Sequence, residues 1–163
     1  MRNSMRLFLL AMTALLTISV IAAEIPPIVD AARHQDTVML KHLLNAGSDP
    51  DTQQADGATA LHWAVYHENI DAVASLIEAD SNVDAVNRLG ASPLYLAAKN
   101  GSANLIELLL EAGANPNAAM PMGETPIMTA ARSGTAQGVQ LLVEAGADVN
   151  IAEQSREQTA LMW

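Results

Sequence analysis

The residues of this chain best suited to metal binding or acid–base chemistry are its four histidines, His34, His42, His62 and His67. None of them forms a recognised ligand pattern such as HExxH, and no acid and base fall at a spacing that suggests a catalytic pair. The chain has no cysteine, which excludes a thiol nucleophile and thiolate metal ligands. The sequence therefore predicts a protein that is not an enzyme and that uses no metal or cofactor.

The run Asp49-Pro50-Asp51, followed by Asp56-Gly57, has a superficial likeness to a calcium-binding loop. A calcium loop needs alternating oxygen ligands and a more distant glutamate, and both are missing here. A glycine-rich phosphate loop and a Gly-x-Ser-x-Gly elbow are missing as well. We therefore interpret these acids as turn residues rather than as ligands.

Two short phrases recur along the chain and indicate how the elements around these residues are organised. The first phrase, TALHWAV, begins at Thr59, and its relatives begin at Ser92, Thr125 and Thr159, at a nearly constant step. The second phrase keeps the same step, and its copies begin at Ala46, Ala79, Ala112 and Ala145. Two phrases locked to one period indicate that one small structural unit is stacked side by side.

Each unit is predicted to consist of two short antiparallel helices and a projecting turn. In the third unit, Ser92 is expected to cap a helix over residues 93–100, with Pro93 at its first position. A second helix is expected over residues 102–112, because its leucines are spaced to line one face. Helices this short are marginal alone, so neighbouring units must hold them. Equivalent helices are expected at 27–33, 37–46, 59–66, 70–79, 125–132 and 135–145.

The length of this period and the TPLH-like opening phrase make the chain resemble the ankyrin repeat family. The resemblance covers nearly everything after residue 25 and implies an all-α solenoid of helix-turn-helix units with projecting turns. Residues 24–163 are expected to form about four such units and a truncated fifth. The resemblance also implies that His62 hydrogen-bonds back to Thr59 and ties the loop to the helix. His42, among apolar residues of a second helix, is expected to be half-buried.

Three positions depart from the family pattern, and a fourth position weakens a helix. Gln35 and Glu68 stand where the family usually places a glycine between its helices, and Asp80 stands where the other units have a glycine. Gly138 lies inside the second helix of the fourth unit, where it should cost about 1 kcal/mol relative to alanine. The sequence offers no reason for this glycine.

Residues 1–23 have the layout of a secretory signal peptide. Two arginines come first, an uncharged apolar run extends from Leu7 to Ile21, and Ala22-Ala23 precede Glu24. We expect cleavage near Ala22 or Ala23, and therefore a periplasmic or secreted protein. The alternative is an uncleaved membrane anchor, because the apolar run is near the lower limit of the ~17 to 25 residues that a spanning helix needs.

Removal of residues 1–23 takes away two of the eight basic residues and none of the 18 acidic ones, so the net charge becomes 6 minus 18, or −12. Such a charge argues against general affinity for nucleic acid or anionic lipid, because the chain cannot neutralise phosphates. We therefore expect a monomer that binds another protein and that does not contact the membrane after cleavage.

The last residues, from Thr159 to Trp163, begin a fifth copy of the opening phrase. Repeat arrays normally finish with a unit whose outer face is polar, and this sequence has none. We therefore expect the sequence to be a fragment of a longer protein. The function expected first is that of a non-catalytic protein-binding module. The alternative function is that of a targeting region or scaffold in a larger secreted enzyme whose catalytic domain is missing from the fragment.

Counting by the repeat places Arg33, Tyr66, Lys99 and Arg132 at one equivalent position near the ends of successive first helices. We call these four residues the stripe. They are expected to cross the concave surface that stacking creates, which is the usual binding surface of such solenoids. The stripe is predicted to recognise an acidic segment of a partner protein. The alternative is that its cations only stabilise helix C-termini, which the backbone dipole favours by roughly 0.3 to 1 kcal/mol each.

Further contacts with the partner are predicted from the turns and helix ends beside the stripe. Leucine and methionine side chains would supply apolar contact, and the other members of this set would supply polar or charged contact. The set consists of His67, Arg88, Leu89, Asn100, Met122 and Glu124. Trp63 shares a helix with Tyr66, and its spacing leaves open whether it faces the groove or the next unit.

Overall fold

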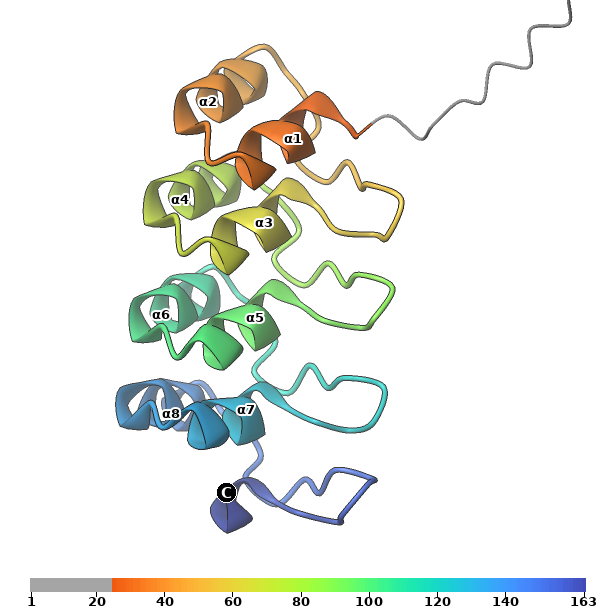
Figure 1. Ribbon diagram of the computed structural model, residues 1–163. Helices are drawn as coiled ribbons and strands as arrows, with labels where there is room; N and C mark the ends of the chain where they lie inside the picture. Colours follow the sequence, from red (N-terminus) through yellow and green to blue (C-terminus); the bar gives the residue numbers. More distant parts are fainter. Residues whose placement is uncertain (1–24) are drawn as a thin grey trace, which may run out of the picture.

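The computed structural model describes residues 25–163, so the predicted signal peptide over 1–23 lies outside the described residues. Within 25–163 the chain forms eight α-helices in four antiparallel pairs, and no strand forms there (Figure 1). The first helices of the pairs are α1 (Pro27–Arg33), α3 (Ala60–Tyr66), α5 (Pro93–Asn100) and α7 (Pro126–Ser133). The second helices are α2 (Thr37–Asn45), α4 (Ile70–Glu78), α6 (Ala103–Glu111) and α8 (Ala136–Glu144). A 3₁₀ turn, η1 (Ala160–Met162), follows. The predicted all-α solenoid is confirmed.

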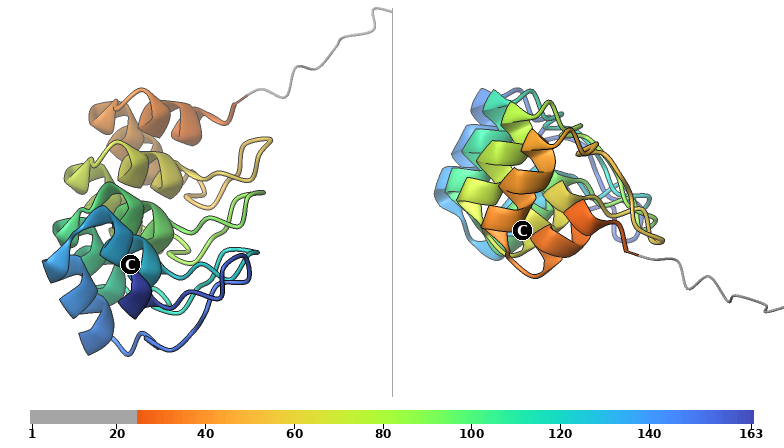
Figure 2. Two further views of the ribbon diagram at one scale, coloured as in Figure 1. Left: turned by 60° about the horizontal axis from the view of Figure 1, so that its bottom comes forward. Right: turned by 90° about the horizontal axis from the view of Figure 1, so that it is seen from above.

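The helices form two layers, and the loops project from them to one side. The helices α1, α3, α5 and α7 stack on one another in one column, with η1 against α7, while α2 packs on α4 and α6 packs on α8. The loops that precede α3, α5, α7 and η1 extend away from both layers in the same direction (Figures 1 and 2). We call the surface made by the first-helix column and the projecting loops the concave face.

The core is one continuous apolar layer between the two helix columns. Each unit contributes side chains at the same repeat positions, as Leu61, Leu94 and Ile127 do in the first helices. Leu76 and Leu109 hold one equivalent position in the second helices, and both are fully buried. Because the helices are seven to nine residues long, they are too short to be stable alone, and the shared core holds them in place.

A chain of Asp and Asn side chains links the turns of successive units. Within a turn, Asp51 donates its backbone N–H to Asp49 Oδ1 at 2.9 Å. Between turns, Asp51 Oδ1 accepts the backbone N–H of Asn82 at 2.7 Å. The same alternation continues through Asp84, Asn115, Asn117, Asp148 and Asn150. Asp49 and Asp51 are therefore turn acceptors, and no group of three or more possible metal ligands comes together in residues 25–163.

The three residues that replace glycine take up a left-handed backbone. The backbone φ is 59° at Gln35, 55° at Glu68 and 58° at Asp80. Glycine at the equivalent helix ends has the same handedness, with φ of 72° at Gly101. The turn geometry is thus kept at all these positions, at a cost of about 1 kcal/mol or more wherever a side chain must adopt it.

The structure gives a reason for Gly138, which the sequence did not. A Cβ atom at this position would lie 2.8 Å from Ile106 Cδ1 and 2.7 Å from Thr135 Cγ2. Ile106 is fully buried, so it has little room to move away. Gly138 therefore allows Ile106 of the preceding unit to pack directly against the backbone of α8.

The chain of turn acceptors predicts a specific difference between two substitutions at Asp84. Asp84→Ala removes the acceptor of the Asn115 N–H and should lower the free energy of unfolding by about 1 kcal/mol. Asp84→Asn keeps an acceptor oxygen, as Asn117 does in the next turn, and should lower it by much less. Urea unfolding followed by far-UV circular dichroism measures both values. Equal losses in the two variants would show that the carboxylate charge matters and the hydrogen bond does not.

Candidate protein-binding face

The structure places the stripe on the concave face. Arg33 and Tyr66 are the last residues of α1 and α3, and Lys99 and Arg132 come one residue before the ends of α5 and α7. All four side chains are exposed, and Tyr66 keeps 58% of its surface in contact with solvent.

Two cations of the stripe already have partners within the chain. The guanidinium of Arg33 lies over the Trp63 ring, with Cζ 5.5 Å from the ring centroid. Arg132 stacks on Trp163 in the same way, with a distance of 5.3 Å, and also forms an ion pair with Glu124. Lys99, by contrast, is exposed and forms no ion pair with any residue in the described part of the chain.

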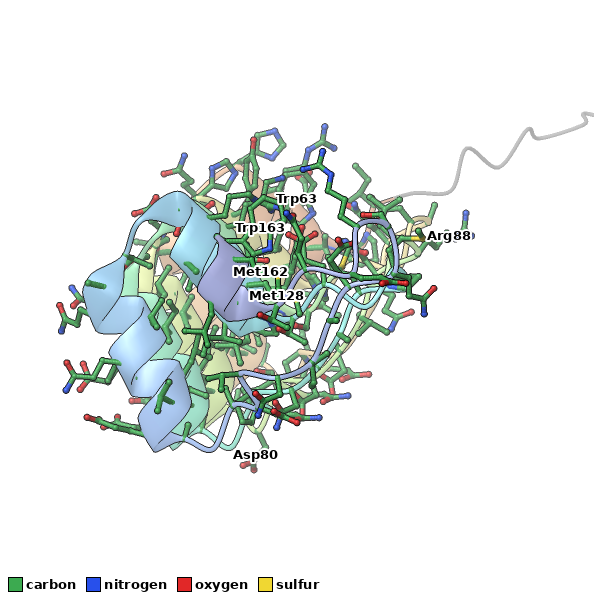
Figure 3. The ribbon with its side chains drawn as sticks, turned by 90° about the horizontal axis from the view of Figure 1, so that it is seen from below. Trp63, Asp80, Arg88, Met128, Met162 and Trp163 are labelled. Carbon is green, nitrogen blue, oxygen red and sulfur yellow. The ribbon has the colours of Figure 1, made fainter. Side chains whose placement is uncertain are left out.

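Trp63 faces the groove, which settles the orientation that the sequence left open. Its ring meets Tyr66 edge-on with centroids 5.8 Å apart and stacks against His67 at 6.0 Å. Figure 3, viewed along the stack, shows Trp63 and Trp163 on the same side of the molecule and Asp80 on the opposite side. The spacing of Trp63 and Tyr66, three positions apart, was the available signal, because it puts two side chains on one helix face.

Two of the polar residues predicted beside the stripe, Asn100 and Glu124, already have partners within the chain. Asn100 Nδ2 donates to the carbonyl of Val65 at 3.1 Å, and so caps the C-terminus of α3. Glu124 accepts a hydrogen bond from Thr129 Oγ1 at 3.1 Å, in addition to its ion pair with Arg132. The carboxamide of Asn100 and the carboxylate of Glu124 are therefore already engaged by groups of this chain.

The loop residues of the predicted set lie farther out. Arg88 is exposed near the tip of its loop (Figure 3), and its backbone N–H donates to the carbonyl of Asp56 at 2.8 Å. Leu89 and Met122 are 73% and 56% exposed. His67 is half-buried, with its ring 5.1 Å from Tyr66. The structure thus brings His67 and Tyr66 together and leaves Arg88, Leu89 and Met122 on the loops.

His62 links a loop, a helix and the next unit. Its Nδ1 lies 2.9 Å from Thr59 Oγ1 and accepts the backbone N–H of Thr59 at 3.2 Å, which confirms the expected tie. Its Nε2 lies 3.0 Å from the carbonyl of Ala91. A carbonyl only accepts, so Nε2 carries the proton and Nδ1 accepts. The expectation for His42 was wrong: this side chain is exposed, because it lies on the outer surface of α2.

Burial of His62 predicts a pH dependence of stability. Burial lowers the pKa of His62 below its ordinary value of 6.5, so the unfolded chain binds a proton more readily than the folded one. The free energy of unfolding should therefore decrease as the pH falls below about 6.5, by at most about 1.4 kcal/mol per pH unit for this one proton.

Replacement of His62 tests this dependence. Urea unfolding is measured from about one pH unit above to about one pH unit below the ordinary histidine pKa, in the protein and in His62→Gln. The variant should lose part of the slope of stability against pH, because it lacks the buried titrating group. His42→Gln, which changes an exposed histidine, is the control and should keep the slope. Identical slopes in the protein and in His62→Gln would contradict the assignment.

The short helix pairs, the single continuous core and the loops projecting to one side together define a helical repeat protein. Models of the ankyrin repeat match the chain over residues 28–120, as three copies, and again over residues 122–154. The chain belongs to the ankyrin repeat family, whose repeats indicate a protein–protein interaction module. Comparison with the curated proteins finds no match to this chain. None of the helices in residues 25–163 combines the length and the apolar character needed to cross a bilayer.

Proposed function

We propose that this chain binds a partner protein on its concave face and does so outside the cytoplasm. The observation that carries the proposal is the row of exposed side chains on consecutive first helices, with Tyr66 and Lys99 at its centre. Tyrosine is among the residues most often responsible for binding energy in protein interfaces. A rigid solenoid holds such residues in place before the partner arrives, which lowers the entropy lost on binding.

The distribution of charge supports a partner with an acidic group opposite Lys99. The second helices, on the other side of the molecule, carry most of the helical acids, which are Asp71, Glu78, Glu107, Glu111 and Glu144. Among lysines and arginines in the described range, only Lys41 in α2 lies on a second helix. The remaining lysines and arginines of 25–163 lie on first helices or in projecting loops, so the basic side chains gather on the concave side, next to the acids of the same loops.

A pair of matched substitutions tests the binding face. Lys99→Glu should reduce capture of the native partner from periplasmic extract roughly tenfold or more, because the charge of a contact residue is reversed. Lys41→Glu makes the same change on an exposed residue of α2 and should leave capture unaltered. Quantitative mass spectrometry of the captured protein gives the readout, and circular dichroism checks that both variants are folded. Equal capture by both would mean that Lys99 only stabilises the C-terminus of α5.

Export is supported by the signal-peptide layout of residues 1–23. The expected result is that intact-mass measurement of the protein recovered from the exported fraction gives a chain that begins near Glu24. Replacing Leu10 and Leu15 by arginine would interrupt the apolar run and should retain the chain in the cytoplasm. A protein that still begins at Met1 and is recovered in the membrane fraction would instead support an anchor.

A further inference from the structure

A hollow of about 310 Å³ opens in the concave face beside Tyr66. Trp63 and Tyr66 from α3 line it, together with Leu96 of α5. Asp56, Ala58 and Asn87 from the loops and His62 from α3 complete the lining. The hollow thus combines aromatic surfaces that meet at 82°, an aliphatic contact and a carboxylate.

Gln54 holds the indole and the carboxylate in a defined relation. Its Oε1 accepts the indole N–H of Trp63 at 3.3 Å. Its Nε2 donates to both oxygens of Asp56, at 2.8 and 2.9 Å. The backbone N–H of Ala58 donates to Asp56 Oδ1 as well, at 2.9 Å. The aromatic ring and the carboxylate are therefore positioned before any ligand binds, which is the condition for selective recognition.

The chemistry of this lining suits a cation. The hydrogen bond from Ala58 lowers the pKa of Asp56, so the carboxylate is ionised at neutral pH. Aromatic faces attract cations, and a planar guanidinium both stacks on an aromatic ring and donates in a fork to a carboxylate. The overall charge of −12 in residues 24–163, 6 basic against 18 acidic side chains, also favours the approach of a basic segment.

The chain itself contains an example of a guanidinium stacked on this indole, next to the hollow. A neighbouring hollow of about 340 Å³ is also lined by Trp63 and Asp56. Arg33 lines that second hollow and stacks on Trp63 at 5.5 Å. The same indole and the same carboxylate thus border one hollow that an arginine of the chain also lines and another whose lining contains no arginine.

The arrangement occurs only once among the loops of the second, third and fourth units. One and two periods after Asp56, the equivalent positions carry Leu89 and Met122. The position of Gln54 becomes Asn87 and then Met120. The indole, amide and carboxylate combination is therefore not a general property of the repeat. In the fifth unit an indole returns with Trp163, but Arg156 stands at the position of Asp56.

We propose that the hollow beside Tyr66 receives an arginine side chain of the partner protein. The guanidinium stacks against the aromatic pair and donates to Asp56, while the aliphatic part of the side chain lies against Leu96. This inference rests on the proposed function, and it adds a basic anchor on the second unit to the acidic contact expected at Lys99. The partner segment would then carry an arginine at one end of its contact surface and an acidic residue farther along.

The test uses a small probe and does not depend on identification of the partner. Nα-acetyl-arginine amide is titrated into the ¹⁵N-labelled protein, and the indole N–H resonance of Trp63 is followed by NMR. Trp163→Phe assigns the two indole resonances of the chain. We expect a saturable shift of the Trp63 resonance. The citrulline and norleucine amides, which lack the charge, should bind roughly fivefold more weakly.

Matched variants assign the interaction to the hollow. Asp56→Asn retains an acceptor for Ala58 but lacks the charge, and it should weaken arginine binding roughly fivefold. Tyr66→Ala should weaken arginine binding by a similar factor. Because the Tyr66 side chain is exposed, this substitution should leave the protein folded, and the loss of binding would not reflect unfolding. Asp80→Asn changes the same charge on the opposite side of the molecule (Figure 3) and should leave binding unaltered.

Three results would overturn the proposal: no saturable shift, equal binding of the arginine, citrulline and norleucine amides, or an equal effect of Asp56→Asn and Asp80→Asn. Loss of partner capture in Lys99→Glu, together with any of these results, would leave the binding face in place and remove only the arginine anchor. Probe binding in the hollow with unaltered capture in Lys99→Glu would support the arginine site and contradict the acidic contact expected at Lys99.

Discussion

The apolar side of each helix pair in this protein can be removed from water only by the next pair. A helix of seven to nine residues is barely stable in isolation, and one pair encloses no interior of its own. The buried leucines and alanines recur at the same repeat positions, and together they form one cluster that runs through all four units. Stability therefore depends on adjacency, as expected for a solenoid whose units interact mainly with their neighbours.

Polar contacts determine how adjacent units are aligned. The Asp and Asn side chains of one turn accept backbone N–H groups of the next turn. Asn100 and Ser133 donate to carbonyls at the helix ends of the preceding unit. His62 joins the loop before α3 to the carbonyl of Ala91 in the following loop. These bonds are directional where the core is not, so they fix the spacing of the loops that form the concave face.

Periodicity was enough to predict the architecture, because each phrase encodes a local structure that repeats. Ser92 caps α5 through the N–H of Tyr95 as expected, and the predicted helices over 27–33 and 93–100 match the observed bounds. Ser102 and Thr135, expected to be helical, are instead the residues just before α6 and α8. The difference arises because a capping residue lies outside the helical backbone although it belongs to the same repeated motif.

The side-chain contacts of the concave face could not be predicted in the same way. Repeat counting placed Arg132 on the stripe but gave no indication of its ion pair with Glu124, since the pairing depends on how the loop folds back. A repeating pattern specifies equivalent positions, whereas such contacts involve residues that differ from unit to unit.

Pro121 interrupts a row of main-chain hydrogen bonds between neighbouring loops. Main-chain hydrogen bonds join the loops of the second and third units, from Arg88 to Asp56, and those of the fourth and fifth, from Gln154 to Met122. At the equivalent place between the third and fourth units the donor would be Pro121, which has no N–H. The Pro121 ring instead packs against Gly90. A Cβ atom added at Gly90 would lie only 2.5 Å from Pro121 Cδ. Between the third and fourth units these loops therefore meet at Pro121 through van der Waals contact, and the hydrogen bond from the Asn115 N–H to Asp84 still joins the two loops to one another.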